Sequence, residues 1–133
     1  MPLFDRGPLQ QDGLLAERWG QDGSTVVNTA DAISNASDTT VHTVTAGKKL
    51  FVTDITVQIR SITTGTNQAL LVRDNGTGGT LKLQINIENY TGGEFVFFNL
   101  KTPIQFDTDV NVDDNNIGSF AAYFTLSGWE EDA

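Results

Sequence analysis

The feature that most constrains this chain is a strict alternation of apolar and polar residues in two segments. Every second side chain is apolar between residues 80 and 88, and again between residues 119 and 126. The apolar members are Leu81, Leu83, Ile85 and Ile87, then Phe120, Ala122, Phe124 and Leu126. Successive side chains of a strand point to opposite faces of a sheet, so a period of two predicts strands with one buried face.

Further strands are expected over residues 41–46, 48–60, 68–74 and 94–100, and from residue 103 to about 112. Gly- and Asn-rich turns separate them, and the clearest is the run from Asp74 to Gly79. Within residues 48–60 the apolar parity changes between Val52 and Ile55, which predicts a β-bulge. Several short strands without any helical pattern predict an all-β domain: a sandwich, a jelly roll or a barrel.

The first 38 residues lack such a pattern. Their large apolar residues are separated by Gly, Pro, Gln and Asp, and only residues 24–27 suggest a short strand. We therefore divide the chain into an extended N-terminal arm and linker, residues 1–38, and a jelly-roll-like β-sandwich, residues 39–133. A segment that has large apolar side chains but cannot fold alone can use those side chains as anchors on a partner. The predicted anchors are Leu3, Phe4, Leu9, Leu14, Leu15 and Trp19.

Charge and composition exclude several classes of function. The net charge is −9, from 8 basic and 17 acidic residues, whereas a nucleic-acid partner requires a basic surface. The chain start has no basic segment followed by an apolar run, and no apolar run approaches the ~20 residues of a membrane-spanning helix. We therefore expect neither a nucleic-acid nor a membrane partner. Cysteine is absent, so disulfides and thiolate metal ligands are excluded.

The candidates for catalysis are weak. His42 is the only histidine, it lies on an expected strand, and no nucleophile motif accompanies it. We interpret it as a polar cross-strand residue. The sequence thus predicts no enzyme, no cofactor and no small-molecule substrate.

Two acidic segments have alternative interpretations. Asp107, Asp109, Asn111 and Asp113 alternate, so an extended chain places them on one face, where their oxygens could bind calcium. We favour a solvated edge strand whose like charges discourage edge pairing, and expect no metal. The run Glu130-Glu131-Asp132 is interpreted as a solvated acidic tail.

Two sets of apolar and aromatic residues suggest contact surfaces. A sugar-stacking platform is one interpretation of the scattered aromatics, but packing is favoured for Trp19, Tyr90, Tyr123 and Trp129. The segment from residue 95 to residue 98 is apolar on both faces, so both faces need to be covered by other parts of the protein. The second face of the last strand is also less polar than is usual for a face in contact with water. Subunit contacts are therefore expected at Phe95, Phe97, Phe98, Ala121 and Tyr123.

Three segments carry a resemblance to a known family. They are the strand–Gly-Lys turn–strand of residues 43–55, the PIQF sequence at 103–106, and YFTLSGWE at 123–130. Over residues 39–130 the chain resembles the jelly-roll domains of tailed-bacteriophage virion proteins, above all capsid decoration (cement) proteins. The resemblance implies a homotrimer on the capsid surface, assembled in the host cytoplasm, whose arm reaches across neighbouring major capsid proteins. A carbohydrate-binding jelly-roll module of a phage tail or fibre protein is the alternative.

Overall fold

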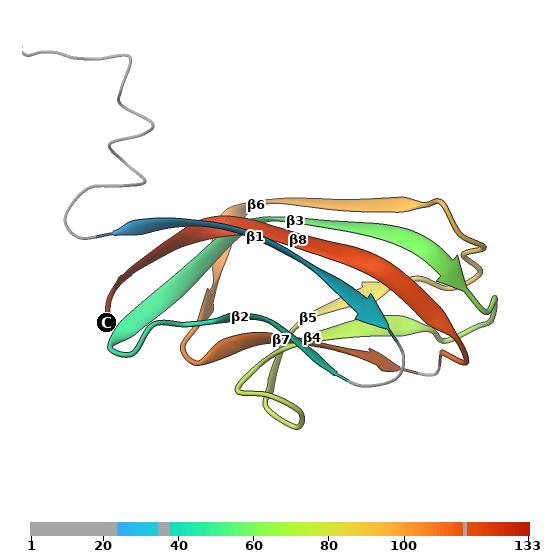
Figure 1. Cartoon of the computed structure of the whole chain (residues 1–133), viewed down its shortest axis with the longest axis horizontal. Helices are drawn as coiled ribbons and strands as arrows, with labels where there is room; N and C mark the ends of the chain where they lie inside the picture. Colours follow the sequence, from blue (N-terminus) through green and yellow to red (C-terminus); the bar gives the residue numbers. More distant parts are fainter. Residues whose placement is uncertain (1–23, 35–37, 116) are drawn as a thin grey trace, which may run out of the picture.

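Eight strands and no helix make up the computed structural model, which describes residues 24–34, 38–115 and 117–133 (Figure 1). The strands are β1 (Thr25–Ser34), β2 (Thr39–Thr43), β3 (Lys48–Ile62), β4 (Ala69–Asp74), β5 (Thr80–Asn86), β6 (Phe95–Phe106), β7 (Asp109–Asn115) and β8 (Phe120–Asp132). In this part of the chain no helix is long and apolar enough to cross a membrane.

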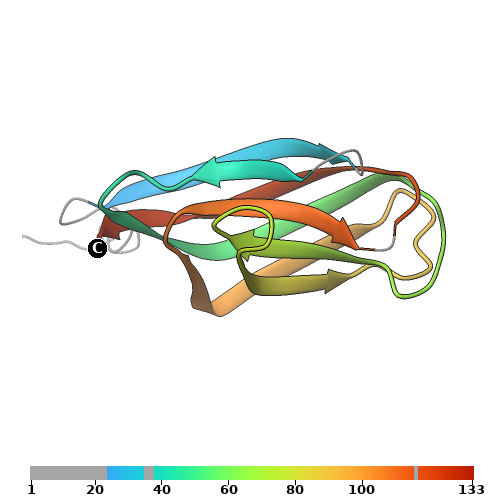
Figure 2. The same cartoon turned by 90° about the horizontal axis from the view of Figure 1, so that it is seen from below.

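The strands form two antiparallel sheets of four, with the orders β1-β8-β3-β6 and β2-β7-β4-β5. The sheets lie one above the other in Figure 1, and the second is nearer the viewer in Figure 2. Only β4 and β5 follow each other within one sheet; every other connection crosses between the sheets. Eight strands in two sheets with these crossings form a jelly roll, so the predicted fold is confirmed.

The core lies between the sheets and contains the alternating residues that the sequence identified. Leu50, Val52, Ile55, Val57 and Ile59 of β3 are each at most 1% exposed, as are Phe124 and Leu126 of β8. The register of β3 shifts between Val52 and Asp54 against both of its neighbours. That shift is the predicted bulge, and it keeps Val52 and Ile55 on the buried face although three residues separate them.

The sandwich begins earlier than the boundary at residue 39 that the pattern predicts. Strand β1 pairs with β8 along its whole length, from Thr25 opposite Glu130 to Ser34 opposite Ala121. It is an edge strand, and only Val27 and Ile33 are buried in it. So sparse a pattern resembles a linker, which is why the expected strand of residues 24–27 is too short.

Three further strands, β5, β6 and β7, differ in detail from the expectation. Between Val72 and Arg73 the pairing of β4 with β5 is irregular, and Leu81 comes to lie opposite Arg73. Leu81 is therefore 44% exposed, instead of joining Ile85 and Ile87 in the core. The expected strands 94–100 and 103–112 are arranged differently: β6 continues through Pro103 to Phe106, and β7 begins at Asp109.

We predict that Gly128→Ala destabilises the fold by about 1–3 kcal/mol or more, the cost of overpacking a close contact. Gly128 lies opposite Val52 in β3, and a Cβ at this position would lie 1.9 Å from the Phe51 carbonyl oxygen. Chemical denaturation measures the loss. Gly118→Ala is the matched control, because its nearest neighbours would lie at 3.6 Å. Equal stability of the two variants would contradict the packing argument.

Candidate functional site

The outer face of the β1-β8-β3-β6 sheet collects exposed apolar side chains. Residues directly opposite one another on paired strands share a face. Ala32, Tyr123, Gln58 and Phe95 thereby form one row across the sheet, and Ala30, Thr125, Thr56 and Phe97 form the next. Four of the five large apolar residues exposed in the described structure lie on this face: Val26, Phe95, Phe97 and Tyr123. We call it the outer aromatic face.

Phe95 and Phe97 are its most prominent side chains. They are 54% and 72% exposed, and their rings stack with centroids 5.9 Å apart. Both come from β6, at the edge of the sheet. At the opposite end of the face the rings of Phe51 and Trp129 stack at 5.4 Å, next to Val26. The exposed apolar side chains thus form two groups, one at each end of the same face.

The predicted subunit-contact residues separate into two groups. Phe95 and Phe97 of β6 lie on the outer aromatic face together with Ala121 and Tyr123 of β8, and β3 lies between the two strands. Phe98 lies on the opposite face of β6 and packs against the core. It is therefore not part of the outer aromatic face, because adjacent residues of a strand point to opposite faces. Its contact with another subunit stays a prediction. The six predicted arm anchors, Leu3 to Trp19, lie outside the described residues.

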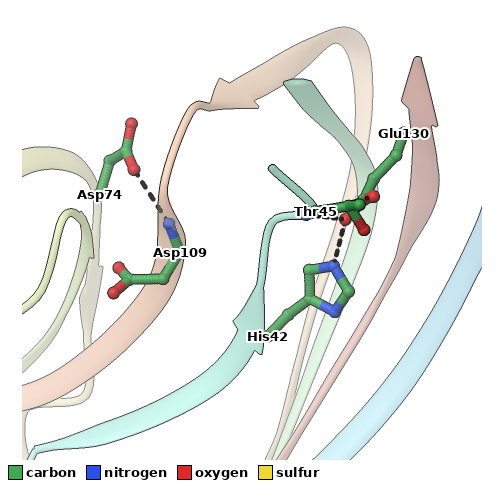
Figure 3. Close-up of polar contacts among 5 residues, drawn as sticks. All are labelled: His42, Thr45, Asp74, Asp109 and Glu130. Atoms are coloured by element: carbon green, nitrogen blue, oxygen red, sulfur yellow. Dashed lines mark hydrogen bonds and ion pairs between the residues drawn. The ribbon is translucent and has the colours of Figure 1, made fainter. Parts of the chain in front are cut away.

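A second cluster links the two sheets at one end of the sandwich (Figure 3). His42 of β2 and Glu130 of β8 approach to 2.7 Å between Nε2 and Oε2, and the Thr45 backbone amide donates to the same carboxylate at 3.2 Å. Glu130 is 3% exposed. Burial alone would raise the pKa of Glu130, but hydrogen bonds from His42 and Thr45 outweigh it and leave the pKa below its usual value of 4.5.

The interpretation of residues 130–132 as a solvated tail is therefore wrong. β8 extends to Asp132, and its Glu130 side chain points between the sheets toward β2. His42 is a cross-sheet rather than a cross-strand partner. The single histidine was the only indication of this pair in the sequence. Its partner could not be identified from the sequence because Glu130 lies 88 residues away from His42.

Two aspartates hold the β4–β5 turn against β7. The buried Asp74 carboxylate accepts hydrogen bonds from the backbone amides of Asp107, Thr108 and Asp109 at 2.8–3.2 Å. The last of these is drawn in Figure 3. The Asp109 carboxylate accepts in turn from the amides of Asn75 and Gly76, each at 3.0 Å. This reciprocal arrangement is structural, since each carboxylate satisfies backbone donors.

We expected the acidic stripe from Asp107 to Asp113 to lie on an edge strand, and this prediction is wrong. β7 lies between β2 and β4, and Asn111 is 2% exposed. Asn111 donates to the Asp38 carboxylate at 2.9 Å, and Thr77 donates to the same group. Among the described residues no three acidic or imidazole side chains are placed to hold a metal ion.

The aromatics considered for a sugar platform are not assembled into one. Tyr90, in the loop between β5 and β6, packs against the core. Tyr123 and Trp129 share the outer face of β8 but are six residues, or about 20 Å, apart along the strand. Trp19 lies outside the described residues. The carbohydrate alternative therefore gains no support from this arrangement.

Comparison with known proteins identifies the fold. No protein-family model and no curated protein matches the chain. Among solved structures, it is similar to a chain of the cyanophage Pam1 capsid asymmetric unit, with a TM-score of 0.53 and 13% identity over 80% of this chain and 85% of that one. A chain of infectious bursal disease virus, Gx strain, is 14% identical over 84% of this chain and 33% of that chain, with a TM-score of 0.36. The first similarity shows a shared fold.

We predict that Glu130→Gln lowers stability at neutral pH by about 1–3 kcal/mol, because a charged acceptor of buried hydrogen bonds is lost. The pKa of Glu130 is lowered on folding, so its contribution is present above pH 4.5 and is lost as the pH falls through the folded value. Denaturation between pH 7 and pH 3 should therefore show a shallower acid loss in the variant. Glu131→Gln, at the neighbouring, less buried position, should keep the wild-type profile.

Proposed function

We propose that this chain is a virion structural protein, a capsid decoration (cement) protein without catalytic activity. In this proposal it trimerises through the outer aromatic face and staples neighbouring major capsid subunits at the capsid surface. The observation that carries the proposal is the gathering of Val26, Phe95, Phe97 and Tyr123 on one face of a jelly roll. Exposed apolar side chains on one face of a domain are typical of a surface that contacts another protein.

The fold supports the capsid assignment. The Pam1 structure with the shared fold is a capsid asymmetric unit, and the similarity covers most of both chains. A chain of similar size and architecture therefore exists within a bacteriophage capsid. The resemblance of residues 39–130 to decoration proteins points to the same setting.

The dimensions of the outer aromatic face suit a subunit contact. Four strands at ~4.8 Å spacing and about ten residues at ~3.3 Å each give a face of about 600 Å² in projection. A specific interface buries about 800 Å² per partner, so this face supplies most of one such contact. Three arms on one trimer would then bind capsid subunits together, and avidity would offset the entropy lost when each arm becomes ordered.

Phe97→Ser should convert the trimer to monomers, because it removes the most exposed aromatic side chain of the proposed contact. Sedimentation equilibrium measures the molar mass. Leu81→Ser is the matched control: Leu81 is 44% exposed but lies on the other sheet, and its loss should leave the trimer intact. A wild-type protein that stays monomeric at all concentrations would refute the trimer.

Deletion of residues 1–23 should abolish binding to capsids while the trimer remains folded. All eight strands lie beyond the deletion, which removes the predicted anchors Leu3 to Trp19. Co-sedimentation with capsids that lack the protein measures binding, and circular dichroism with molar mass checks the fold. Undiminished capsid binding by the truncated trimer would exclude the arm as the staple.

A further inference from the structure

A groove of about 470 Å³ opens on the outer aromatic face, beside Tyr123. The ends of β1 and β3 and the start of β8 surround it. It is lined by Ala32, Ile33, Ser34, Arg60, Ser61, Ala121, Ala122 and Tyr123. The groove is open because most of its lining side chains are small, and Arg60 is the only charged residue among them.

Arg60 is aimed into this position by the backbone. The pairing of β3 with β8 is irregular between Ile59 and Ser61, so Arg60 is the extra residue of a bulge, a feature that redirects a side chain. Its guanidinium carbon lies 5.1 Å from the centroid of the Tyr123 ring. Within the described part of the chain no carboxylate forms an ion pair with it.

The charge of the groove lining is opposite in sign to that of the chain as a whole. The net charge is −9, yet the groove lining and the two adjacent rows of the face contain no carboxylate. The exposed Asp31 carboxylate accepts from the amide of the lining residue Ala32, so like-charge repulsion between two acidic molecules is reduced at this face but not absent. A guanidinium stacked on an aromatic ring and facing a carboxylate is a common central element of protein interfaces, where Arg and Tyr are enriched.

We infer that this groove is a recognition site for a carboxylate side chain of a second copy of this chain, with Arg60 as its charged anchor. The inference deepens the proposed function, since it rests on self-association through the outer aromatic face. A second copy fits because it carries 17 acidic residues against 8 basic ones. Contact between two copies of the same groove would place Arg60 against Arg60. The charge therefore favours a head-to-tail contact, the type of contact that joins the subunits of a ring such as a trimer.

The test uses the full chain in sedimentation equilibrium at about 50 mM and about 500 mM NaCl, since salt screens charge pairs. Arg60→Gln should raise the dissociation constant of self-association by about tenfold to a hundredfold at low salt and reduce its salt dependence. Lys82→Gln removes the same charge from β5 of the other sheet and should change neither quantity. Circular dichroism checks that each variant is folded.

The outcomes separate this inference from the proposed function. Trimers of Arg60→Gln with the same dissociation constant and salt dependence as Lys82→Gln would overturn the role of Arg60 and leave trimerisation intact. A wild-type chain that never associates would overturn both. The carboxylate contact is supported if Arg60→Gln weakens association while Lys82→Gln keeps the association and the salt dependence of the wild type.

Discussion

Pairing between β3 and β8 is the constraint on which the rest of the structure depends. The two strands are the longest in the molecule and form the centre of one sheet, where each contributes alternate residues to the core. Strand β1 pairs only with β8, and β6 only with β3, so neither edge strand has a place until the central pair exists. Residues 48–62 must meet residues 120–132, a non-local contact that is expected to make folding slow. The close approach of Gly128 to the Phe51 carbonyl shows how tightly this pair is joined.

Strands with a strong local pattern could be predicted from the sequence, and even the bulge after Val52 was readable. A parity change needs an extra residue if both flanking apolar side chains are to stay buried. The same argument could not predict that Leu81 lies on the exposed face of its strand. The pairing irregularity is at the end of the strand, and no apolar residue follows it there to show that the buried and exposed positions have exchanged. Strand β1 was underestimated for a related reason. An edge strand with one buried residue near each end leaves too little periodicity to distinguish it from a linker.

The contacts between sheets could not be predicted in this way. Periodicity states which face of a strand is buried but not what lies opposite. Glu130 is predicted to begin a solvated tail because no neighbouring residue in the sequence indicates that His42 and the Thr45 amide will bond its carboxylate. Likewise the acidic stripe after Asp107 suggested an edge strand, although β7 lies inside its sheet and Asp109 is committed to the backbone amides of Asn75 and Gly76. The order of strands decides such roles, and a linear pattern does not contain it.

The two outer faces of the sandwich differ in a way that bears on function. On the β2-β7-β4-β5 side, carboxylates fasten loops: Asp38 accepts from Thr77 and Asn111, and Asp109 accepts from the amides of Asn75 and Gly76. On the β1-β8-β3-β6 side, stacked aromatics are left exposed, and a bulge directs Arg60 over Tyr123. Selection for solubility alone would make both faces polar, as lone surface charges are cheap and exposed Phe is not. The asymmetry therefore supports an orientation in the proposed assembly, with the aromatic face of each copy against a carboxylate-bearing surface of its neighbour. It also explains how a chain with a net charge of −9 could associate with itself, since the groove that would receive the neighbour's carboxylate is lined by Arg60 and by no acidic residue.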